Sequence, residues 1–173
     1  MESRCAEVEL RRMADDDFDL VRPWFDDPEN AKWLKSVYRF AKYNKITHES
    51  SLKQRSNYLC IGVVGDTPVG LVALSLIDRL DRNAMVWYLV ANNKFRGRGI
   101  GTRLVNLILK EAFGSFALQS VYASVVSGNH GSCRVLEKNN FRKVGLQRRC
   151  HYSTEGLFHD RLIFDILSEE FSG

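Results

Sequence analysis

Three glycines alternate with other residues in one short stretch of the sequence, NNKFRGRGIGTRL, which runs from Asn92 to Leu104. Three arginines, Arg96, Arg98 and Arg103, fall within eight residues of the same stretch. Glycines let backbone N–H groups come close to a bound anion, and arginines form charge-assisted hydrogen bonds with it. This spacing favours the binding of phosphate groups, although a disordered RNA-binding segment and an ordinary basic turn have the same composition.

The flanking residues place this stretch between a strand and a helix. The preceding segment AMVWYLV, Ala84 to Val90, is rich in β-branched and aromatic residues, and the following segment has apolar residues at helical spacing. A helix N-terminus has about four backbone N–H groups without an internal partner and carries a partial positive charge. The stretch is not a GxGxxG dinucleotide motif, because Thr102 stands at the third glycine position, and it lacks the GK[ST] ending of an NTP-binding loop.

A different pattern does match. Arg96, Gly99 and Gly101 occupy the defining places of [QR]xxGx[GA], and the segment NHGSCRVLEKNNFRKVG begins further on, at Asn129. Here the sequence resembles the GCN5-related N-acetyltransferase (GNAT) superfamily, in which this loop wraps the pyrophosphate of acetyl-coenzyme A. The segment FDDPENAKWL and the final H…D…I..IL pattern resemble the branch of ribosomal-protein N-terminal and aminoglycoside acetyltransferases. The resemblance covers residues 8–167.

The resemblance implies a binding site for acetyl-coenzyme A, the acetyl donor. Leu89 and Val90, at the end of the strand, are expected to offer backbone groups to the pantetheine arm. Asn129 is expected to contact the cofactor, and a helix cap next to Gly128 is an equal alternative for its side chain. The predicted pyrophosphate cradle consists of Arg96, Gly97, Arg98, Gly99, Ile100, Gly101 and Thr102.

Acetyl transfer to an amine also needs a neutral amine and a proton donor for the departing thiolate. Leu136 stands where many relatives have a tyrosine, so the resemblance assigns the proton donor to Ser132, for which a helix N-cap is the alternative role. No general base is identified, because the strand AMVWYLV lacks the glutamate that many relatives carry. Trp33 and Tyr88 are the predicted residues of the acceptor pocket.

The resemblance leaves the acceptor open among a protein N-terminus, an aminoglycoside and an amino sugar. A polyamine is less favoured, because the sequence has no conspicuous acidic cluster to bind one. Two other interpretations remain: a catalytically silent relative that binds acetyl-coenzyme A, and a nucleic-acid-binding module that uses Arg96, Arg98, Arg148 and Arg149.

The composition sets the broad class. A chain of 173 residues with 45% hydrophobic and 11% aromatic residues suits one globular domain, residues 1–173, with a core over about residues 8–167. The net charge of +4 is modest, which favours a local phosphate site over a nucleic-acid surface. We expect a cytoplasmic monomer or homodimer without a membrane span, a metal site or a nucleic-acid partner. The sequence has no CxxC pair, no apolar run at its start and no uninterrupted apolar run of about 18 residues.

The predicted element order is β-α-α-β-β-β-α-β-α-β-β, an α+β (mixed α/β) fold. Turns are predicted at Gly65 to Pro68 and at Ser153 to Gly156, each between two strands. The polar segment from Lys42 to Asn57 is expected to be a loop or a frayed helix. The resemblance implies a central, twisted, mostly antiparallel sheet of about seven strands with about four flanking helices, splayed between the fourth and fifth strands.

Overall fold

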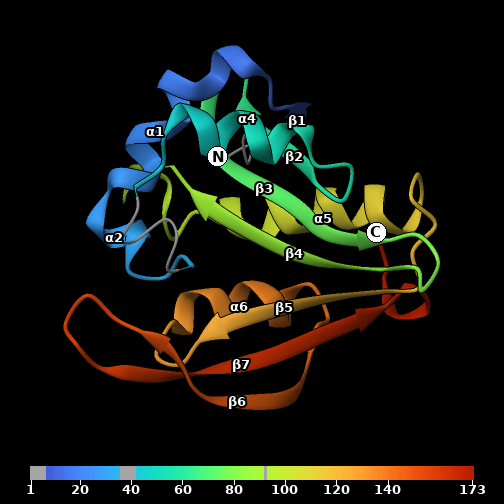
Figure 1. Ribbon diagram of the computed structural model, residues 1–173. Helices are drawn as coiled ribbons and strands as arrows, with labels where there is room; N and C mark the ends of the chain where they lie inside the picture. The colour runs from blue at the N-terminus through green and yellow to red at the C-terminus, as the bar shows by residue number, and fades with distance from the viewer. Residues whose placement is uncertain (1–6, 36–41, 92) are drawn as a thin grey trace, which may run out of the picture.

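The computed structural model describes residues 7–35, 42–91 and 93–173, and its centre is a seven-stranded sheet with the order β1-β2-β3-β4-β5-β7-β6 (Figure 1). All neighbouring strands are antiparallel except β4 and β5, which are parallel. The predicted mostly antiparallel sheet is therefore confirmed. The strands are β1 (Glu9–Arg12), β2 (Tyr58–Val64), β3 (Thr67–Asp78), β4 (Asn83–Val90), β5 (Ser120–Val126), β6 (Arg142–Tyr152) and β7 (Phe158–Leu167).

The described residues form five α-helices, one more than the sequence predicted. The additional helix is α4, in the polar segment expected to be a loop or frayed helix. It forms because the Asn44 side chain accepts a hydrogen bond from the Thr47 backbone N–H at 3.0 Å, while the Thr47 hydroxyl accepts one from the Asn44 backbone N–H at 3.0 Å. The helices are α1 (Phe18–Asp26), α2 (Pro28–Ala31), α4 (Lys45–Lys53), α5 (Ile100–Phe113) and α6 (His130–Lys138), with 3-10 turns η1 (Asp15–Asp17), η2 (Asn93–Phe95) and η3 (Ser168–Glu170).

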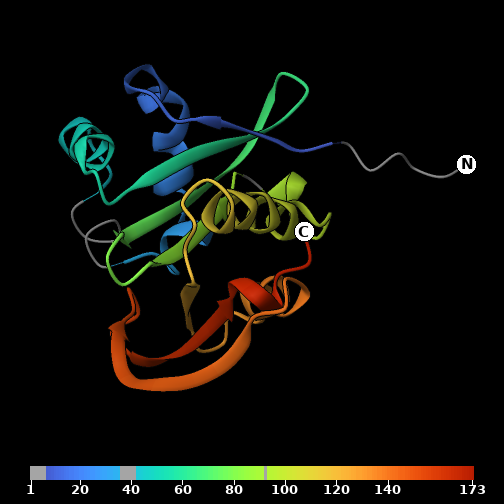
Figure 2. The ribbon, with the colours of Figure 1, turned by 90° about the vertical axis from the view of Figure 1, so that its right-hand side faces the viewer.

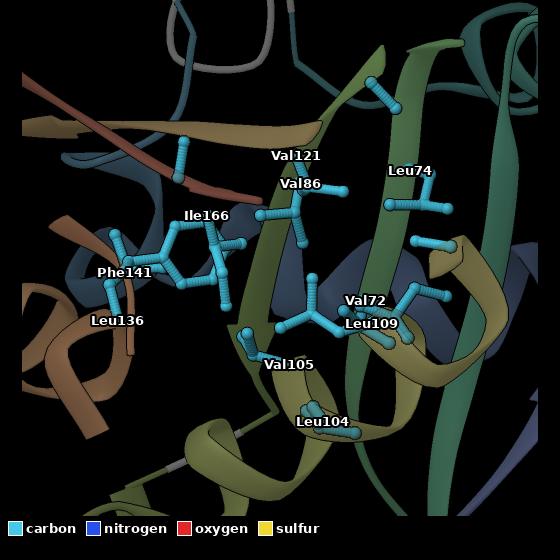
Figure 3. Close-up of a cluster of buried hydrophobic side chains, with 14 of the residues drawn as sticks. Val72, Leu74, Val86, Leu104, Val105, Leu109, Val121, Leu136, Phe141 and Ile166 are labelled. Carbon is cyan, nitrogen blue, oxygen red and sulfur yellow. The ribbon is translucent and has the colours of Figure 1, made fainter. Parts of the chain in front are cut away.

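Helices cover both faces of the sheet, as the side view in Figure 2 shows. On one face α5 packs its apolar side, including Leu104, Val105 and Leu109, against strand residues such as Val72 and Val86 (Figure 3). On the other face α1 packs against the sheet through Val21, Trp24 and Phe25. Successive side chains of β4 therefore point to opposite layers, with Tyr88 on the α5 face and Trp87 on the α1 face.

The fourth and fifth strands separate along their length, as predicted. β4 and β5 pair only at the start of each strand, where Asn83, Ala84 and Met85 lie opposite Ser120, Val121 and Tyr122. Beyond that point the two ribbons diverge, as Figure 1 shows. Because a strand that leaves its neighbour keeps backbone groups without sheet partners on that side, the splay creates a cleft with hydrogen-bonding walls.

Both predicted hairpins are present. β2 and β3 flank the turn at Gly65, whose φ of 56° is in the left-handed region that favours glycine. β6 and β7 flank the second turn at Gly156, whose φ is 80°. Within the described residues, no helix is long and apolar enough to cross a membrane. The same residues contain no group of three or more His, Cys, Asp or Glu side chains placed to hold a metal ion.

Candidate active site

A cavity of about 1410 Å³ lies where β4 and β5 separate. Its wall includes most of β4 and β5, the loop before α5, most of α6, and parts of α2, α4 and the β6–β7 hairpin. Ligand sites in proteins are typically clefts of roughly 300–1,000 Å³, so this cavity has room for two ligands side by side.

The glycine loop forms one end of the cavity. Gly97 and Gly99 have φ values of 73° and 77°, and a Cβ atom built on either would meet no heavy atom within 4 Å. The backbone there is consequently open to a ligand, and α5 begins directly after it with Gly99 as N-cap, a residue that has no side chain to cap the first N–H groups. Among the seven predicted cradle residues, all but Arg98 line the cavity, and Arg98 is exposed at its edge.

The third glycine of the loop has a different role. Gly101 is buried, and a Cβ on it would stand 3.3 Å from Val135 Cγ2 and 3.4 Å from Tyr88 Cε2. Its missing side chain thus lets the first turn of α5 lie against both β4 and α6. An open glycine backbone at a helix N-terminus with basic residues around it fits the phosphate groups of coenzyme A.

Arg96 connects this loop to α2. Its Nη2 donates a hydrogen bond of 2.6 Å to Asn30 Oδ1, and Asn30 Nδ2 donates one of 2.9 Å to the carbonyl oxygen of Trp24. Asn30 is 7% exposed, so the loop is attached to a buried polar group. Sequence reasoning missed Asn30 because 66 residues separate it from Arg96 and its own neighbours gave no indication of a partner.

Leu89 and Val90 lie on the stretch of β4 that no longer pairs with β5, and both line the cavity. On its other edge this stretch still pairs with β3, where Leu89 lies opposite Leu71 and Val90 opposite Gly70. The β5 edge of the stretch is therefore available to a ligand within the cavity. This arrangement suits the pairing with a pantetheine arm that the resemblance implies for the two residues.

Ser132 and Tyr88 form a hydroxyl pair. Tyr88 Oη and Ser132 Oγ are 2.7 Å apart, and Tyr88 Oη also lies 3.3 Å from the Ser132 carbonyl oxygen. Burial raises the pKa of Tyr88 well above its ordinary value, while the hydrogen bond to Ser132 partly opposes this shift. Tyr88 therefore remains a protonated donor at neutral pH. The pair lies on the α5 face of the sheet, where Tyr88 meets α6 and lines the cavity. The predicted contact of Tyr88 with the acceptor stays a prediction.

Asn129 is the N-cap of α6. Its Oδ1 accepts a hydrogen bond of 3.1 Å from the Ser132 backbone N–H, so the helix-cap alternative for Asn129 is present in the structure. Because the cap uses the Ser132 backbone and not its side chain, the Ser132 hydroxyl is left to face Tyr88 and the cavity. A contact from Asn129 to the cofactor stays a prediction.

Another part of the cavity wall is formed by the residues after α2, by β4 and by the β6–β7 hairpin. Trp33 and Trp87 line it, and Trp87 Nε1 donates a hydrogen bond of 2.9 Å to Ser75 Oγ. Glu29 is the only carboxylate among the described lining residues, and its pKa is lowered by a 2.8 Å hydrogen bond from Lys32. Asp78, at the end of β3, accepts hydrogen bonds from the backbone N–H groups of Leu80 and Asp81 in its own turn.

Arg161 is a functional candidate that the sequence did not reveal. It lies on β7 opposite Gln147, lines the cavity, and donates to Ser124 Oγ at 3.3 Å and to His151 Nδ1 at 3.0 Å. His151 is 1% exposed, and its Nε2 lies 3.0 Å from the carbonyl oxygen of Lys32. No local pattern could have identified this chain of contacts, since 119 residues separate His151 from Lys32.

Known proteins resemble this chain in both sequence and fold. Residues 7–142 match the family model described as acetyltransferase (GNAT) domain. The chain is 26% identical over 170 residues to an uncharacterized N-acetyltransferase, p20, of Bacillus licheniformis, covering 95% of this chain and 94% of that protein. It is 29% identical over 119 residues to the prophage-derived N-acetyltransferase YokL of Bacillus subtilis, covering 68% and 66% of the two chains.

A solved structure with a similar fold is that of spermidine N-acetyltransferase from Vibrio cholerae in complex with CoA and spermine. Its TM-score is 0.81 at 16% sequence identity, and the match covers 94% of this chain and 96% of that one. At this identity the likeness describes the fold and carries no information about the acceptor.

Proposed function

This chain belongs to the GNAT acetyltransferase family, and from that premise we propose a transfer reaction for it. In this reaction an acetyl group passes from acetyl-coenzyme A to the primary amine of a protein N-terminus or an amino sugar. The amine attacks the thioester directly while both substrates are bound. Acetyl-coenzyme A supplies the activated acetyl thioester. The observation that carries the proposal is the continuous cavity that extends from the glycine loop, past the unpaired edge of β4, to the β6–β7 hairpin.

The chain's own groups support a division of this cavity into two parts. The loop from Arg96 to Thr102 and the backbone of Leu89 and Val90 would hold the phosphates and the pantetheine arm. The space between Trp33 and the hairpin would hold the acceptor. Binding both at once replaces an encounter in solution with an oriented one, which lowers the entropic part of the barrier.

Ser132 is the proposed proton donor to the thiolate. When the Tyr88 hydroxyl, kept protonated by burial, donates to Ser132 Oγ, the proton on Ser132 Oγ points away from Tyr88. A hydroxyl that accepts one hydrogen bond becomes a better donor in the next, because bonds in a chain polarise one another. Tyr88 thus acts through Ser132 as a positioning residue.

The charge of the cavity favours an amine with a low pKa. With one ion-paired carboxylate among the described lining residues, the chain offers little to remove a proton from a strongly basic amine. An α-amino group has a pKa of about 7.7–8.0, against about 10.4 for a lysine-type amine, so a useful fraction of it is already neutral near pH 7. This supports a protein N-terminus as an acceptor.

The same charge distribution disfavours polycations. An aminoglycoside or a polyamine has several ammonium groups that need carboxylate partners, whereas the described lining contains Lys35, Arg96, Arg134, Lys138, Arg149 and Arg161. Like charges in one cleft repel each other. We therefore rank a protein N-terminus and an amino sugar above an aminoglycoside, and place a polyamine last.

An acceptor screen that follows free coenzyme A thiol tests the proposal. The panel contains a tripeptide with a free α-amine, glucosamine, an aminoglycoside and spermidine, and we expect the highest kcat/KM for one of the first two. A highest kcat/KM for the aminoglycoside or spermidine would overturn the acceptor assignment. Absence of thiol release with every amine would contradict the transfer reaction in the form proposed.

Two glycine variants test the donor site separately. Gly99→Trp should abolish the thermal stabilisation by acetyl-coenzyme A, because the indole fills the open side of the loop. Gly65→Trp is the matched control: Gly65 also has a positive φ and no heavy atom within 4 Å of the place a Cβ would take, but it lies in the β2–β3 turn, outside the cavity lining. Equal loss of stabilisation in both variants would show that backbone strain, and not the ligand site, was responsible.

A further inference from the structure

Arg161 is a half-buried guanidinium with neutral partners. Its side-chain hydrogen bonds go to the Ser124 hydroxyl and the His151 ring, and none of the ion pairs among the described residues includes it. A guanidinium has five N–H donors, so these two contacts leave donors for a ligand. Burial lowers the pKa of Arg161, yet an arginine side chain stays charged at any physiological pH.

The contacts of His151 fix the direction in which Arg161 points. A guanidinium only donates hydrogen bonds, so His151 Nδ1 must accept, and the ring hydrogen is then on Nε2, which donates to the Lys32 carbonyl oxygen. The imidazole is therefore neutral and links β7 to the residues directly after α2. Arg161 is held by this link on the hairpin side of the cavity, beside the segment that carries Trp33.

The position of His151 depends on an irregularity in the hairpin. Gln147 lies opposite Arg161 and His151 lies opposite His159, so β6 advances four residues where β7 advances two. A bulge of this kind bends the strand and redirects its side chains. In this hairpin the bulge lies directly before the buried His151, and the His151 ring contacts the guanidinium of Arg161, which lines the cavity.

A partly buried charge without an opposite charge is unfavourable, because it loses part of its hydration without a compensating partner. Among the described residues no carboxylate forms an ion pair with Arg161. Its neighbour Asp160 accepts a hydrogen bond from the Arg149 backbone N–H at 2.8 Å. An anion supplied by a ligand would complete the site, and a planar guanidinium is suited to bind carboxylate or phosphate through two parallel bonds.

We propose that the acceptor of this enzyme carries an anionic group, a carboxylate or a phosphate, near its amine and that the Arg161 guanidinium binds this group. The inference rests on the proposed acetyl transfer and narrows its substrate class. We assign this group to the acceptor and not to the donor, because Arg161 contacts Ser124 of β5 and His151 of the hairpin, whereas the predicted cofactor residues lie on β4, in the glycine loop and at the N-termini of α5 and α6.

Matched acceptor pairs test this directly. Glu-Ala-amide and Gln-Ala-amide differ by a carboxylate, and glucosamine 6-phosphate and glucosamine differ by a phosphate. The wild-type enzyme should turn over the anionic member of at least one pair with a kcat/KM higher by about tenfold or more, since a hydrogen bond to a charged group is worth that factor. The pair that responds identifies which anion the acceptor carries.

Variants at Arg161 separate recognition from folding. Arg161→Gln should reduce the preference for the anionic member to near unity, mainly through KM, while Arg161→Lys keeps part of it because the charge remains without the planar fork. Arg148→Gln is the control: Arg148 is an exposed arginine of the same hairpin that does not line the cavity, and its removal should leave the preference unchanged. Thermal stabilisation by acetyl-coenzyme A should be the same in all three variants.

The outcomes distinguish this inference from the proposed function. Equal kcat/KM for both members of each pair, or a preference that survives in Arg161→Gln, would overturn the role of Arg161 while leaving acetyl transfer intact. If no amine is acetylated, the same pairs are compared by thermal shift in the presence of coenzyme A. Stabilisation by the anionic member alone, lost in Arg161→Gln, would then support the anion site, and equal stabilisation by both members would refute it.

Discussion

The hydroxyl pair of Ser132 and Tyr88 leads to a prediction that can be worked out in detail. The change is Ser132→Ala, with Tyr88→Phe and the double variant beside it. The 2.7 Å contact between Tyr88 Oη and Ser132 Oγ is lost in each. If Ser132 protonates the thiolate, kcat should fall by more than about tenfold, which corresponds to about 1.4 kcal/mol in the activation free energy.

Protein stability should change little by comparison. Ser132→Ala removes one hydrogen bond with a net value of about 1 kcal/mol, equivalent to a decrease of roughly 2–4 °C in Tm for a domain of this size. The N-terminus of α6 remains capped, because Asn129 Oδ1 binds the Ser132 backbone N–H. Affinity for acetyl-coenzyme A should therefore stay near that of the wild type, and the loss should appear in kcat.

The assay is steady-state release of coenzyme A thiol at saturating acetyl-coenzyme A. Ser115→Ala is a suitable control, since the Ser115 hydroxyl bonds to Glu111 and the residue does not line the cavity. Because Tyr88 acts through Ser132, adding Tyr88→Phe to Ser132→Ala should cost almost nothing further. Undiminished kcat in Ser132→Ala would remove Ser132 as donor, and fully additive losses in the double variant would refute the coupling.

Four further results are expected. Arg11 donates two hydrogen bonds to the Asp17 carboxylate, of 2.6 and 2.7 Å, which lower the pKa of Asp17 below its unfolded value of about 3.9. This ion pair should stabilise the folded protein by about 1 kcal/mol above about pH 4, and the stabilisation should be lost as the pH falls through the folded-state pKa. Urea unfolding of wild type and Asp17→Asn at pH 7 and pH 3 should show the difference shrinking at low pH. Leu104→Ala, at a fully buried position of α5, should lower the free energy of unfolding by about 2–5 kcal/mol in the same assay. Gly70→Ala places a Cβ 2.5 Å from the Leu89 carbonyl oxygen, which must displace the end of β4. It should therefore weaken acetyl-coenzyme A binding, measured by calorimetry. An effect on stability alone would argue against a role for this end of β4. Burial raises the pKa of Cys60 to about 11, so its thiol should react with a disulfide reagent at pH 8 only after unfolding, as peptide mapping would show.

Several features were predictable because the information that specifies them is local. The glycines of the Arg96 to Thr102 loop, the strand before it and the helix after it all lie within one continuous segment. The hairpin turns at Gly65 and Gly156 are equally local, since a positive φ favours glycine wherever it is required. For the helix from Lys45 to Lys53 the sequence left a loop and a frayed helix as alternatives, because the segment has few apolar residues at helical spacing and its main helical signal is the capping box of Asn44 and Thr47.

The sequence by itself determined the family and the acetyl donor and predicted the segment that would bind it, since each depends on residue types at short, fixed spacings. Only the tertiary structure decided which side chains meet around the cavity. It placed Tyr88 against Ser132, Arg96 against Asn30, and Arg161 beside a histidine that contacts the end of α2. These partners lie on different strands and helices, so their meeting depends on the splay of β4 from β5 and on the packing of helices on both faces, which no local pattern encodes.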